Sequence, residues 1–382
     1  LAALRALGVG VRGEPGRDAM WIDGKSGPLH APESTGTEAV ELFLGNAGTA
    51  MRPLTAVLAA GRGTFVLQGV PRMHERPIGD LVTGLRQIGA RVTYLGKDGF
   101  PPLRIEAAGL AGGAARVSGA TSSQFLSALL MAAPLARRPV TIEITDALVS
   151  EPYVAMTLAL MARFGVPVAA SGMRRFEVPA PRRYRSPRRV LVEGDASSAT
   201  YFLAGAAITG GTVRVEGCGS DSLQGDARFA QVLERMGARA RYEPATIEVT
   251  GGVLLKGIDA DMTAMPDAAM TLAVVALFAR GATTVRGIGN WRVKETDRLA
   301  AVSTELRKLG ARTEVGADSL VVHPPARIQP ASIATYDDHR MAMAFSLAAC
   351  GGTFVVIENP ACVAKTFPEY FDELERLTVG AG

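Results

Sequence analysis

One pattern recurs along this 382-residue chain: a short polar loop, an alanine-rich apolar segment, a turn and a β-branched segment. The apolar segments are long enough for helices, and the β-branched segments are typical of strands. Equivalent positions in the pattern are separated by 73, 75, 71 and 72 residues, and they are Thr49, Ser122, Ser197, Ala268 and Arg340. A regular interval of this kind predicts a fold built from similar units.

A second helix is predicted in every unit, and it ends in an apolar residue, a glycine and a strand. A glycine is suited to the left-handed position that closes a helix. The second helices are expected near Leu1, Leu81, Met156, Phe229, Leu299 and Phe367, and the closing glycines are Gly8, Gly89, Gly165, Gly237 and Gly310. Six second helices accompany five first helices, so the first repeat is expected to be incomplete. The interval places about fifty residues before Leu1.

The six units predict an α/β protein of two similar domains, residues 1–192 and 193–382, each with three repeats of the βαβαββ type. A chain of this length exceeds one ordinary core, which also favours two domains. The boundary follows a basic stretch, residues 182–189. This stretch is short and has no interleaved aromatic residues. We therefore interpret it as a solvated connector rather than a nucleic-acid site.

Composition excludes several classes of protein. With 48% hydrophobic and 20% charged residues, the chain is expected to be globular rather than disordered. No apolar run is long enough to span a membrane, and the first residues do not have the layout of a signal peptide. Three separated cysteines and four histidines indicate neither a disulfide framework nor a metal site. We predict a cytoplasmic protein with no metal and no cofactor.

The first helices are apolar nearly all round, so they are expected to be buried. The free backbone N–H groups at each of their starts are expected to form an anion site. Charged residues gather in or beside these loops: Arg52, Arg76, Lys294, Arg298, Arg340 and Lys365, with Asp267, Glu295, Asp338 and His339 among them. Arginine and lysine bind phosphate and carboxylate groups. The residues alone therefore predict an enzyme or binding protein for small polyanions.

Several segments resemble the signature segments of bacterial EPSP synthases. They are L-F-L-G-N-A-G-T-A-M-R-P-L from Leu42, G-D-A-S-S-A from Gly194, N-W-R-V-K-E-T-D-R-L from Asn290, D-D-H-R-M-A-M from Asp337 and A-K-T-F-P-E-Y-F from Ala364. The resemblance extends in order from Leu1 to the C-terminus. It implies the enolpyruvyl transferase fold, an inverse α/β barrel of two domains closing over the substrates. It also implies transfer of the enolpyruvyl group from phosphoenolpyruvate to the 5-hydroxyl of shikimate-3-phosphate.

The same resemblance implies roles for individual residues. Shikimate-3-phosphate is expected to contact Ser122, Ser123, Gln124, Ser150 and Tyr153 in the N-terminal domain, and Asp267, Asn290 and Lys294 in the C-terminal domain. Phosphoenolpyruvate is expected to contact Gly48, Thr49, Arg76, Gln124, Arg298, Arg340 and Lys365, with Arg52 nearby as a possible support of the loop. The reaction needs a base, an acid and cations for phosphate. Asp267 is the candidate base and Glu295 is a candidate proton relay. Lys365 is expected to take part in the same proton transfer as Glu295.

Two serines and one short motif are given a structural interpretation. Ser197 and Ser198 are expected to start a helix rather than bind a ligand. The family's segment of the form P-G-S-K-S-x-S-x-R is not found, and Gly24-Lys25-Ser26 opens no helix, so it is not a phosphate-binding loop. This departure led to the expectation that the 382 residues alone are inactive or nearly so. Gly48 and Pro53 follow the pattern associated with inhibition by glyphosate.

One related interpretation and one from another class remain open. A transferase acting on UDP-N-acetylglucosamine shares the repeat fold, but it should carry a reactive cysteine on a mobile loop. Cys218, Cys350 and Cys362 do not have that placement in the sequence. A catalytically dead relative that only binds ligands would keep the same residues. A monomer with small-molecule substrates, and without nucleic acid or membrane partners, is expected.

Overall fold

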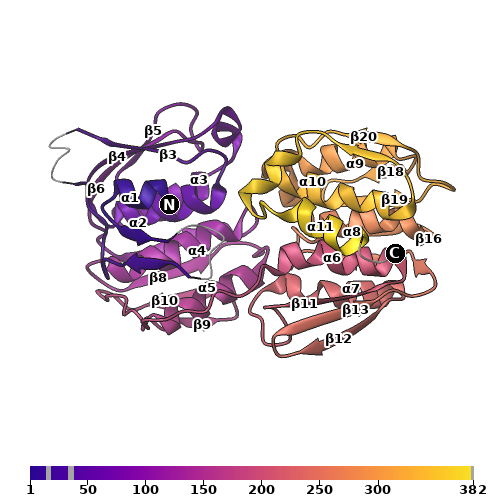
Figure 1. Cartoon of the computed structure of the whole chain (residues 1–382). Coiled ribbons are helices and arrows are strands. Elements are labelled where there is room, and N and C mark those ends of the chain that lie inside the picture. The colour runs from indigo at the N-terminus through magenta and orange to yellow at the C-terminus, as the bar shows by residue number, and fades with distance from the viewer. Residues whose placement is uncertain (14–18, 33–37, 380–382) are drawn as a thin grey trace. The chain divides into compact units, whose positions relative to one another are not determined.

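The computed structural model describes residues 1–13, 19–32 and 38–379. The chain divides into two compact units, Leu1–Leu191 and Val192–Gly382. The sequence placed the boundary after residue 192. Each unit has its own apolar core, and Figure 1 shows that within each unit the helices lie between the sheets.

The first unit contains two four-stranded sheets and a separate two-stranded ribbon, β1-β2, in its described residues. The sheet orders are β3-β4-β6-β5 and β7-β8-β10-β9. The strands are β1 (Gly10–Arg12), β2 (Trp21–Asp23), β3 (Val40–Phe43), β4 (Arg62–Gln68), β5 (Val92–Tyr94), β6 (Leu103–Ala108), β7 (Gly113–Val117), β8 (Val140–Ile144), β9 (Ala169–Ser171) and β10 (Arg175–Val178). The helices are α1 (Ala2–Ala6), α2 (Gly48–Ala59), α3 (Gly79–Gln87), α4 (Ser123–Ala132) and α5 (Glu151–Arg163), with 3₁₀ turns η2 (Pro71–Glu75) and η3 (Ala133–Leu135).

The second unit contains sheets β11-β13-β12 and β15-β17-β19-β18 and the parallel pairs β14-β16 and β20-β21. The strands are β11 (Thr212–Glu216), β12 (Arg239–Glu243), β13 (Thr246–Thr250), β14 (Leu255–Lys256), β15 (Asp259–Asp261), β16 (Ala279–Arg280), β17 (Thr283–Arg286), β18 (Arg312–Val315), β19 (Ser319–His323), β20 (Ala331–Ile333) and β21 (Val355–Ile357). The helices are α6 (Ala196–Thr209), α7 (Phe229–Met236), α8 (Ala269–Val275), α9 (Arg298–Lys308), α10 (His339–Ser346) and α11 (Tyr370–Val379), with 3₁₀ turns η4 (Gly225–Arg228), η5 (Ala276–Phe278), η6 (Gly289–Val293), η7 (Leu347–Gly351) and η8 (Pro360–Lys365).

The predicted alternation of helices is confirmed. The first helices of the repeats are α2, α4, α6, α8 and α10, and each of them is largely buried. The second helices are α1, α3, α5, α7, α9 and α11. The five closing glycines have φ between 72° and 116°, the left-handed region that only glycine enters without strain. The expected stretches around α8 and α10 are partly 3₁₀, because each helix tightens into η5 or η7 at its C-terminal end.

Parallel strand pairs determine where the polar loops lie. Strand β3 is parallel to β4, β7 to β8, β15 to β17, and β20 to β21. A helix or 3₁₀ turn follows each of these strands, so the loops after both members of a pair emerge at the same edge of the sheet. Ligand sites in α/β proteins commonly lie at this edge, outside the carboxyl ends of the strands.

The basic stretch forms no helix or strand. The arginines of residues 182–189 are exposed, whereas Tyr184 is half-buried, and its hydroxyl donates to the carbonyl of Met131 at 2.8 Å. The stretch is therefore solvated, as expected, and its role as a connector stays a prediction. In the described residues, no helix is long and apolar enough to cross a membrane.

Candidate active site

In the first unit, two loops at the carboxyl ends of β3 and β4 are tied together by arginine side chains. Arg76, in the loop after β4, donates to the backbone carbonyl of Asn46 at 2.8 Å and to its side-chain Oδ1 at 3.0 Å. Arg52, on α2, donates to the carbonyl of Pro77 at 3.0 Å. Both arginines are nearly fully buried. A loop pair crossed by two guanidinium groups is positively charged and rigid, which suits an anionic ligand.

The start of α2 is closely approached by these two arginines. Its N-cap residue, Ala47, offers no side-chain acceptor to the free N–H groups of the first turn. A Cβ added at Gly48 would clash with Nη1 of Arg52 and would lie 2.9 Å from Nη2 of Arg76. A side chain at this position would therefore make both guanidinium groups shift away from the helix start. The structure thus brings Gly48, Thr49, Arg52 and Arg76 together.

The loops after β7 and β8 form a second pair in the same unit. Asp146 accepts from the hydroxyl of Ser118 at 2.6 Å and from the backbone N–H of Gly119 at 2.7 Å, which joins the two loops. The loop after β7 leads through Ser122 to Ser123 and Gln124 at the start of α4, and the loop after β8 leads through Ser150 to Tyr153 at the start of α5. The five residues predicted to bind shikimate-3-phosphate in this unit therefore belong to one edge of one sheet.

Individual roles at this second edge are partly structural. The hydroxyl oxygen of Ser122 accepts from the N–H of Gln124 at 3.3 Å, so Ser122 is the N-cap of α4. Its hydroxyl proton remains available to donate. Ser150 is buried and has a φ of 56°, an uncommon conformation for a residue other than glycine. Thr121 donates to Asp80 at 3.1 Å, which links this loop to the first turn of α3.

In the second unit, Arg298 is the centre of a network of ion pairs. Its guanidinium group contacts Asp338 at 2.7 Å and 3.2 Å, Asp267 at 2.8 Å and Glu295 at 3.0 Å. Only 1% of its side chain is exposed. Burial alone would lower the pKa of Arg298, but the three carboxylates outweigh burial and raise the pKa. Arg298 therefore stays charged and determines the positions of the three carboxylates.

Asp267 and Glu295 each bind further cations. Asp267 contacts Arg340 at 3.1 Å and Lys294 at 3.4 Å, and Glu295 contacts Lys365 at 2.6 Å. Burial raises the pKa of Asp267, but Arg340, Lys294 and Arg298 together outweigh burial and hold it well below its usual range. The structure thus joins seven charged residues of this unit in one cluster, which we call the ion-pair cluster. Its members are Asp267, Lys294, Glu295, Arg298, Asp338, Arg340 and Lys365.

Asn290 and His339 are placed beside the ion-pair cluster. Asn290 lies in η6, whose Trp291 donates its indole N–H to the carbonyl of Pro266 at 2.7 Å, next to Asp267. Oδ1 of Asn290 is buried without a hydrogen-bond partner among the described residues. A buried acceptor of this kind is suited to a ligand donor. Burial and the nearby Arg340 lower the pKa of His339 to about 3, so its imidazole is neutral at neutral pH.

The expectation that every first helix starts with an anion site is wrong for α6 and α10 of the second unit, whereas α8 begins after the uncharged Ala268. Asp195 accepts from the N–H of Ser197 at 3.1 Å, and Asp338 accepts from the N–H of Arg340 at 3.0 Å. Each carboxylate accepts from one of the free N–H groups and places a negative charge at the helix start, so the starts of α6 and α10 disfavour a further anion. Ser197 and Ser198 donate to Asp226 and Asp195, which agrees with their predicted structural role.

Sequence reasoning missed two residues that belong to this arrangement. Tyr201, fully buried on α6, accepts from Nη1 of Arg340 at 3.4 Å, and burial raises its pKa to about 12. Asp338 was noted among the charged residues but was given no role, although it forms the shortest contact of Arg298. The repeated Asp at a helix start was a readable signal for Asp338. Nothing in an apolar helix segment distinguished Tyr201.

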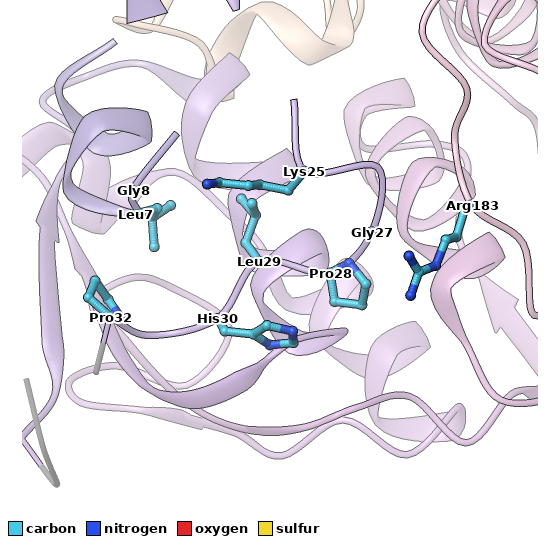
Figure 2. Close-up of a pocket in the computed structure, with 9 residues that line it drawn as sticks. All are labelled: Leu7, Gly8, Lys25, Gly27, Pro28, Leu29, His30, Pro32 and Arg183. Carbon is cyan, nitrogen blue, oxygen red and sulfur yellow. The ribbon is translucent and has the colours of Figure 1, made fainter. Parts of the chain in front are cut away.

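Figure 2 shows a pocket of about 400 Å³ in the first unit that none of the candidate residues lines. Lys25, His30 and Arg183 contribute cations or potential cations to it, but the side chain of Lys25 points away from Arg183 in this view. As predicted, no helix begins at Gly24-Lys25-Ser26. Within the described ranges, no group of three or more His, Cys, Asp or Glu residues could hold a metal ion.

The fold and these loops define a class: α/β proteins built from repeats that gather arginine, lysine and carboxylate groups at strand ends. The family model for EPSP synthase (3-phosphoshikimate 1-carboxyvinyltransferase) matches residues 1–374. The chain therefore belongs to the EPSP synthase family, and it is an enzyme that transfers the carboxyvinyl, or enolpyruvyl, group.

Relatives and solved structures agree with this assignment. A chloroplastic 3-phosphoshikimate 1-carboxyvinyltransferase of Brassica napus is 55% identical over 99% of this chain and 75% of its own length. The corresponding enzyme of Shewanella pealeana is 54% identical over 99% of this chain and 87% of its own. The structure of EPSP synthase from Acinetobacter baumannii matches with a TM-score of 0.75 and 26% identity over 98% of this chain and 86% of that one. The enolpyruvyl transferase fold is confirmed, whereas the expected inactivity of the 382 residues is not borne out.

Proposed function

We propose that the protein carries out its family's reaction, from phosphoenolpyruvate and shikimate-3-phosphate to EPSP and phosphate, with the residues of these strand-end loops. In the first unit, the assigned phosphoenolpyruvate ligands are Gly48, Thr49, Arg76 and Gln124. In the second unit they are Arg298, Arg340 and Lys365. The observation that carries the proposal is the ion-pair cluster, which collects cations for an anionic substrate around carboxylates that can move protons.

Shikimate-3-phosphate is assigned to the second loop pair of the first unit and to three residues of the second unit. The serine hydroxyls and the Gln124 amide can bind its phosphate and hydroxyl groups, and Tyr153 can contact its ring. The residues concerned are Ser122, Ser123, Gln124, Ser150 and Tyr153, together with Asp267, Asn290 and Lys294. The buried, unpartnered Oδ1 of Asn290 supports its part in this assignment.

The chemistry proceeds by addition and elimination. The 5-hydroxyl oxygen bonds to the central carbon of phosphoenolpyruvate and loses its proton to a base, while the methylene carbon receives a proton. The tetrahedral intermediate then loses phosphate from the central carbon and a proton from the new methyl group, which restores the double bond. Asp267 is the assigned base, and Glu295 with Lys365 is assigned to proton transfer at the methyl carbon. The contact of 2.6 Å between Glu295 and Lys365 supports this pairing.

Glu295→Gln should lower kcat by about 10²-fold or more, because an amide cannot carry the proton that a carboxyl group can. The amide oxygen can still accept from Arg298 or Lys365, so the fold should persist. Single-turnover kinetics of phosphate release measure the effect, and Glu314→Gln on exposed β18 is the matched control. A kcat within a factor of two of the parent would remove Glu295 from the scheme.

Substrate choice tests the proposal directly. Phosphate release by the purified protein should require phosphoenolpyruvate and shikimate-3-phosphate, and UDP-N-acetylglucosamine should not replace the latter. A reactive thiol would need a lowered pKa, whereas burial raises the pKa of Cys218, Cys350 and Cys362. Turnover with UDP-N-acetylglucosamine would favour the rival transferase. Calorimetric binding of shikimate-3-phosphate without any phosphate release would favour a binding protein.

Gly48→Ala should raise the KM for phosphoenolpyruvate and the inhibition constant for glyphosate, each by about ten- to a hundredfold. The added methyl group must displace the guanidinium groups of Arg52 and Arg76, and the charge-assisted contacts that they offer a ligand are then lost. Steady-state kinetics with and without glyphosate measure both constants. Gly45→Ala is unsuitable as a control because of its φ of 55°, so Gly205→Ala within α6 serves instead. Unchanged constants would contradict the placement of the inhibitor.

Glyphosate binding, a monomeric state and a cytoplasmic location remain predictions. Size-exclusion chromatography with light scattering measures the oligomeric state, and inhibition kinetics measure glyphosate binding. The division of substrates between the two units likewise remains a proposal.

A further inference from the structure

The segment between β20 and α10 has an unusual backbone. Tyr336 and Asp337 both have a positive φ, 52° and 54°. Left-handed conformations are unfavourable for residues other than glycine, and two in succession persist only where surrounding contacts hold them. Asp338, which binds Arg298, and Arg340, which binds Asp267, follow immediately. The contacts that hold this segment therefore affect the positions of Asp338 and Arg340 in the ion-pair cluster.

Those contacts come from the C-terminal half of α9. Glu305 is fully buried, and its carboxylate accepts from the N–H of Ala334 at 3.2 Å and from the hydroxyl of Tyr336 at 2.8 Å. Lys308 pairs with Glu305 at 2.7 Å and donates to the carbonyl of Ser332 at 3.2 Å. The lysine is the cation paired with this buried carboxylate, which accepts both bonds.

The same helix holds the other end of the segment. Arg298, the first residue of α9, binds Asp338, so α9 is bonded to the segment on both sides of the two left-handed residues. Between these anchors the chain has little freedom, and α10 begins one residue beyond Asp338. The bonds at both anchors thus fix the direction in which the side chain of Arg340 projects from the start of α10.

We propose that Glu305 and Tyr336 are positioning residues, forming a latch that holds the 334–338 segment and thereby aims Asp338 and Arg340 in the ion-pair cluster. The functional part of this inference rests on the proposed role of Arg340 as a phosphoenolpyruvate ligand. Glu305 and Tyr336 are bonded to each other, and Glu305 also contacts the backbone N–H of Ala334 and the side chain of Lys308; none of these contacts goes to a residue of the cluster. Their effect on catalysis is therefore indirect.

The latch should work over the whole pH range in which the enzyme acts. Tyr336 is 42% exposed, and its partial burial together with the hydrogen bond to Glu305 raises its pKa to about 12. The phenol consequently remains protonated and donates to Glu305 at neutral and mildly alkaline pH. A variant that removes only the hydroxyl should reproduce the loss of the latch without changing the size of the side chain.

Tyr336→Phe and Glu305→Gln test the latch in two measurements. Hydrogen–deuterium exchange should become faster in the peptide that covers residues 334–341, while exchange in α6 and α7 stays the same. The KM for phosphoenolpyruvate should rise about five- to tenfold, because a misdirected Arg340 loses part of a charge-assisted contact. The KM for shikimate-3-phosphate should stay within a factor of two.

Controls separate positioning from general destabilisation. Tyr242→Phe on β12 and Glu314→Gln on β18 make the same chemical changes elsewhere in the second unit, and neither should alter the exchange of residues 334–341. Because both bonds belong to one latch, the double variant Glu305→Gln/Tyr336→Phe should change the KM by less than the product of the two single effects.

Unchanged exchange in residues 334–341 of both single variants would overturn the latch. Faster exchange with an unchanged KM, in a protein where Arg340→Lys does raise the KM for phosphoenolpyruvate, would overturn the positioning role. If Arg340→Lys leaves that KM unchanged, the assignment of Arg340 as a ligand is wrong. The exchange measurement still decides whether the latch exists, so the two failures are distinguishable.

Discussion

Asp267→Asn is expected to lower kcat by about 10²- to 10⁴-fold, the range typical for the loss of a general base. Asparagine keeps the size of the side chain and an oxygen that can accept from Arg298 or Lys294, but it cannot take the proton of the substrate's 5-hydroxyl. The fold and the binding of shikimate-3-phosphate should therefore be largely retained. Single-turnover phosphate release measures the chemical step, and calorimetry measures binding.

The pH dependence offers a second measure of the same role. A base acts only when deprotonated, so activity falls as the pH drops through the pKa of Asp267. In the free protein, Arg340, Lys294 and Arg298 hold that pKa well below its usual range. Phosphoenolpyruvate would compete for Arg298 and Arg340, which weakens their hold on Asp267 and raises its pKa. The acid limb of kcat should therefore lie at higher pH than the acid limb of kcat/KM.

Asp318→Asn, in the exposed turn before β19, is the matched control and should leave both pH profiles unchanged. Near-normal turnover by Asp267→Asn would assign the base elsewhere. If kcat and kcat/KM fall over the same acidic pH range, substrate binding does not raise the pKa of Asp267.

The fold was highly predictable because each repeat shows the same order of local signals. Gly89 and Gly237 closed helices where the sequence placed them, since their left-handed conformation is a property of the residue itself. The ends of α8 and α10 were less predictable. Each passes into a 3₁₀ turn before its sheet resumes, and the apolar composition of the segment is compatible with either geometry.

The site was predictable residue by residue but not as a set of contacts. The loops at the ends of parallel strands could be located from the pattern, which is why Arg76 and Arg298 were found. Their partners could not be derived, because the contact of Arg298 with Asp338 joins positions 40 residues apart through side-chain geometry alone. The latch residue Glu305 likewise reads in the sequence as an ordinary polar position on an amphipathic helix.

The starts of the first helices differ from one another for a reason that the sequence does contain. Asp195 and Asp338 are helix N-caps, and a carboxylate at that position occupies the free N–H groups that would bind an anion. In the first unit, the caps are Ala47 and Ser122, which carry no charge. Applying the capping rule to each helix separately would have removed α6 and α10 from the predicted anion sites and kept α2, α4 and α8, whose N-cap Ala268 is uncharged.

The ion-pair cluster of the second unit therefore interacts with anions in a different way. Its lysines and arginines already contact carboxylates. Arg298 by itself contacts three of them, Asp267, Glu295 and Asp338. A substrate anion must compete with these carboxylates, so binding redistributes ion pairs instead of filling an empty positive site. Competition of this kind favours ligands with several negative groups and couples ligand binding to the pKa of Asp267.

Arg298→Met should destabilise the second unit by about 3–5 kcal/mol, the usual result of removing one partner of a buried ion pair. Asp338 is fully buried and Asp267 nearly so, and both would lose their shortest contact to a cation. Methionine fills much of the same volume, so the loss reports the unpaired charges rather than a cavity. Urea unfolding measures it through Trp291, which is buried in η6 of this unit. A Trp21→Phe background makes Trp291 the single tryptophan, since the chain has two.

Arg286→Met is the matched control, because Arg286 contacts Asp259 at 2.7 Å in an exposed pair whose loss should change the urea midpoint little.

The pH dependence of the stability identifies the cause of the destabilisation. In the parent, the lowered pKa of Asp267 contributes stability above the ordinary carboxyl pKa of about 4, and that stability is lost as the pH falls. In Arg298→Met, burial raises carboxyl pKa values, so protonation relieves the unpaired charges as the pH falls. The stability difference between the two proteins should therefore narrow in acid. A difference independent of pH would mean that Arg298 stabilises the unit by packing, and not as the cation that holds three carboxylates in place.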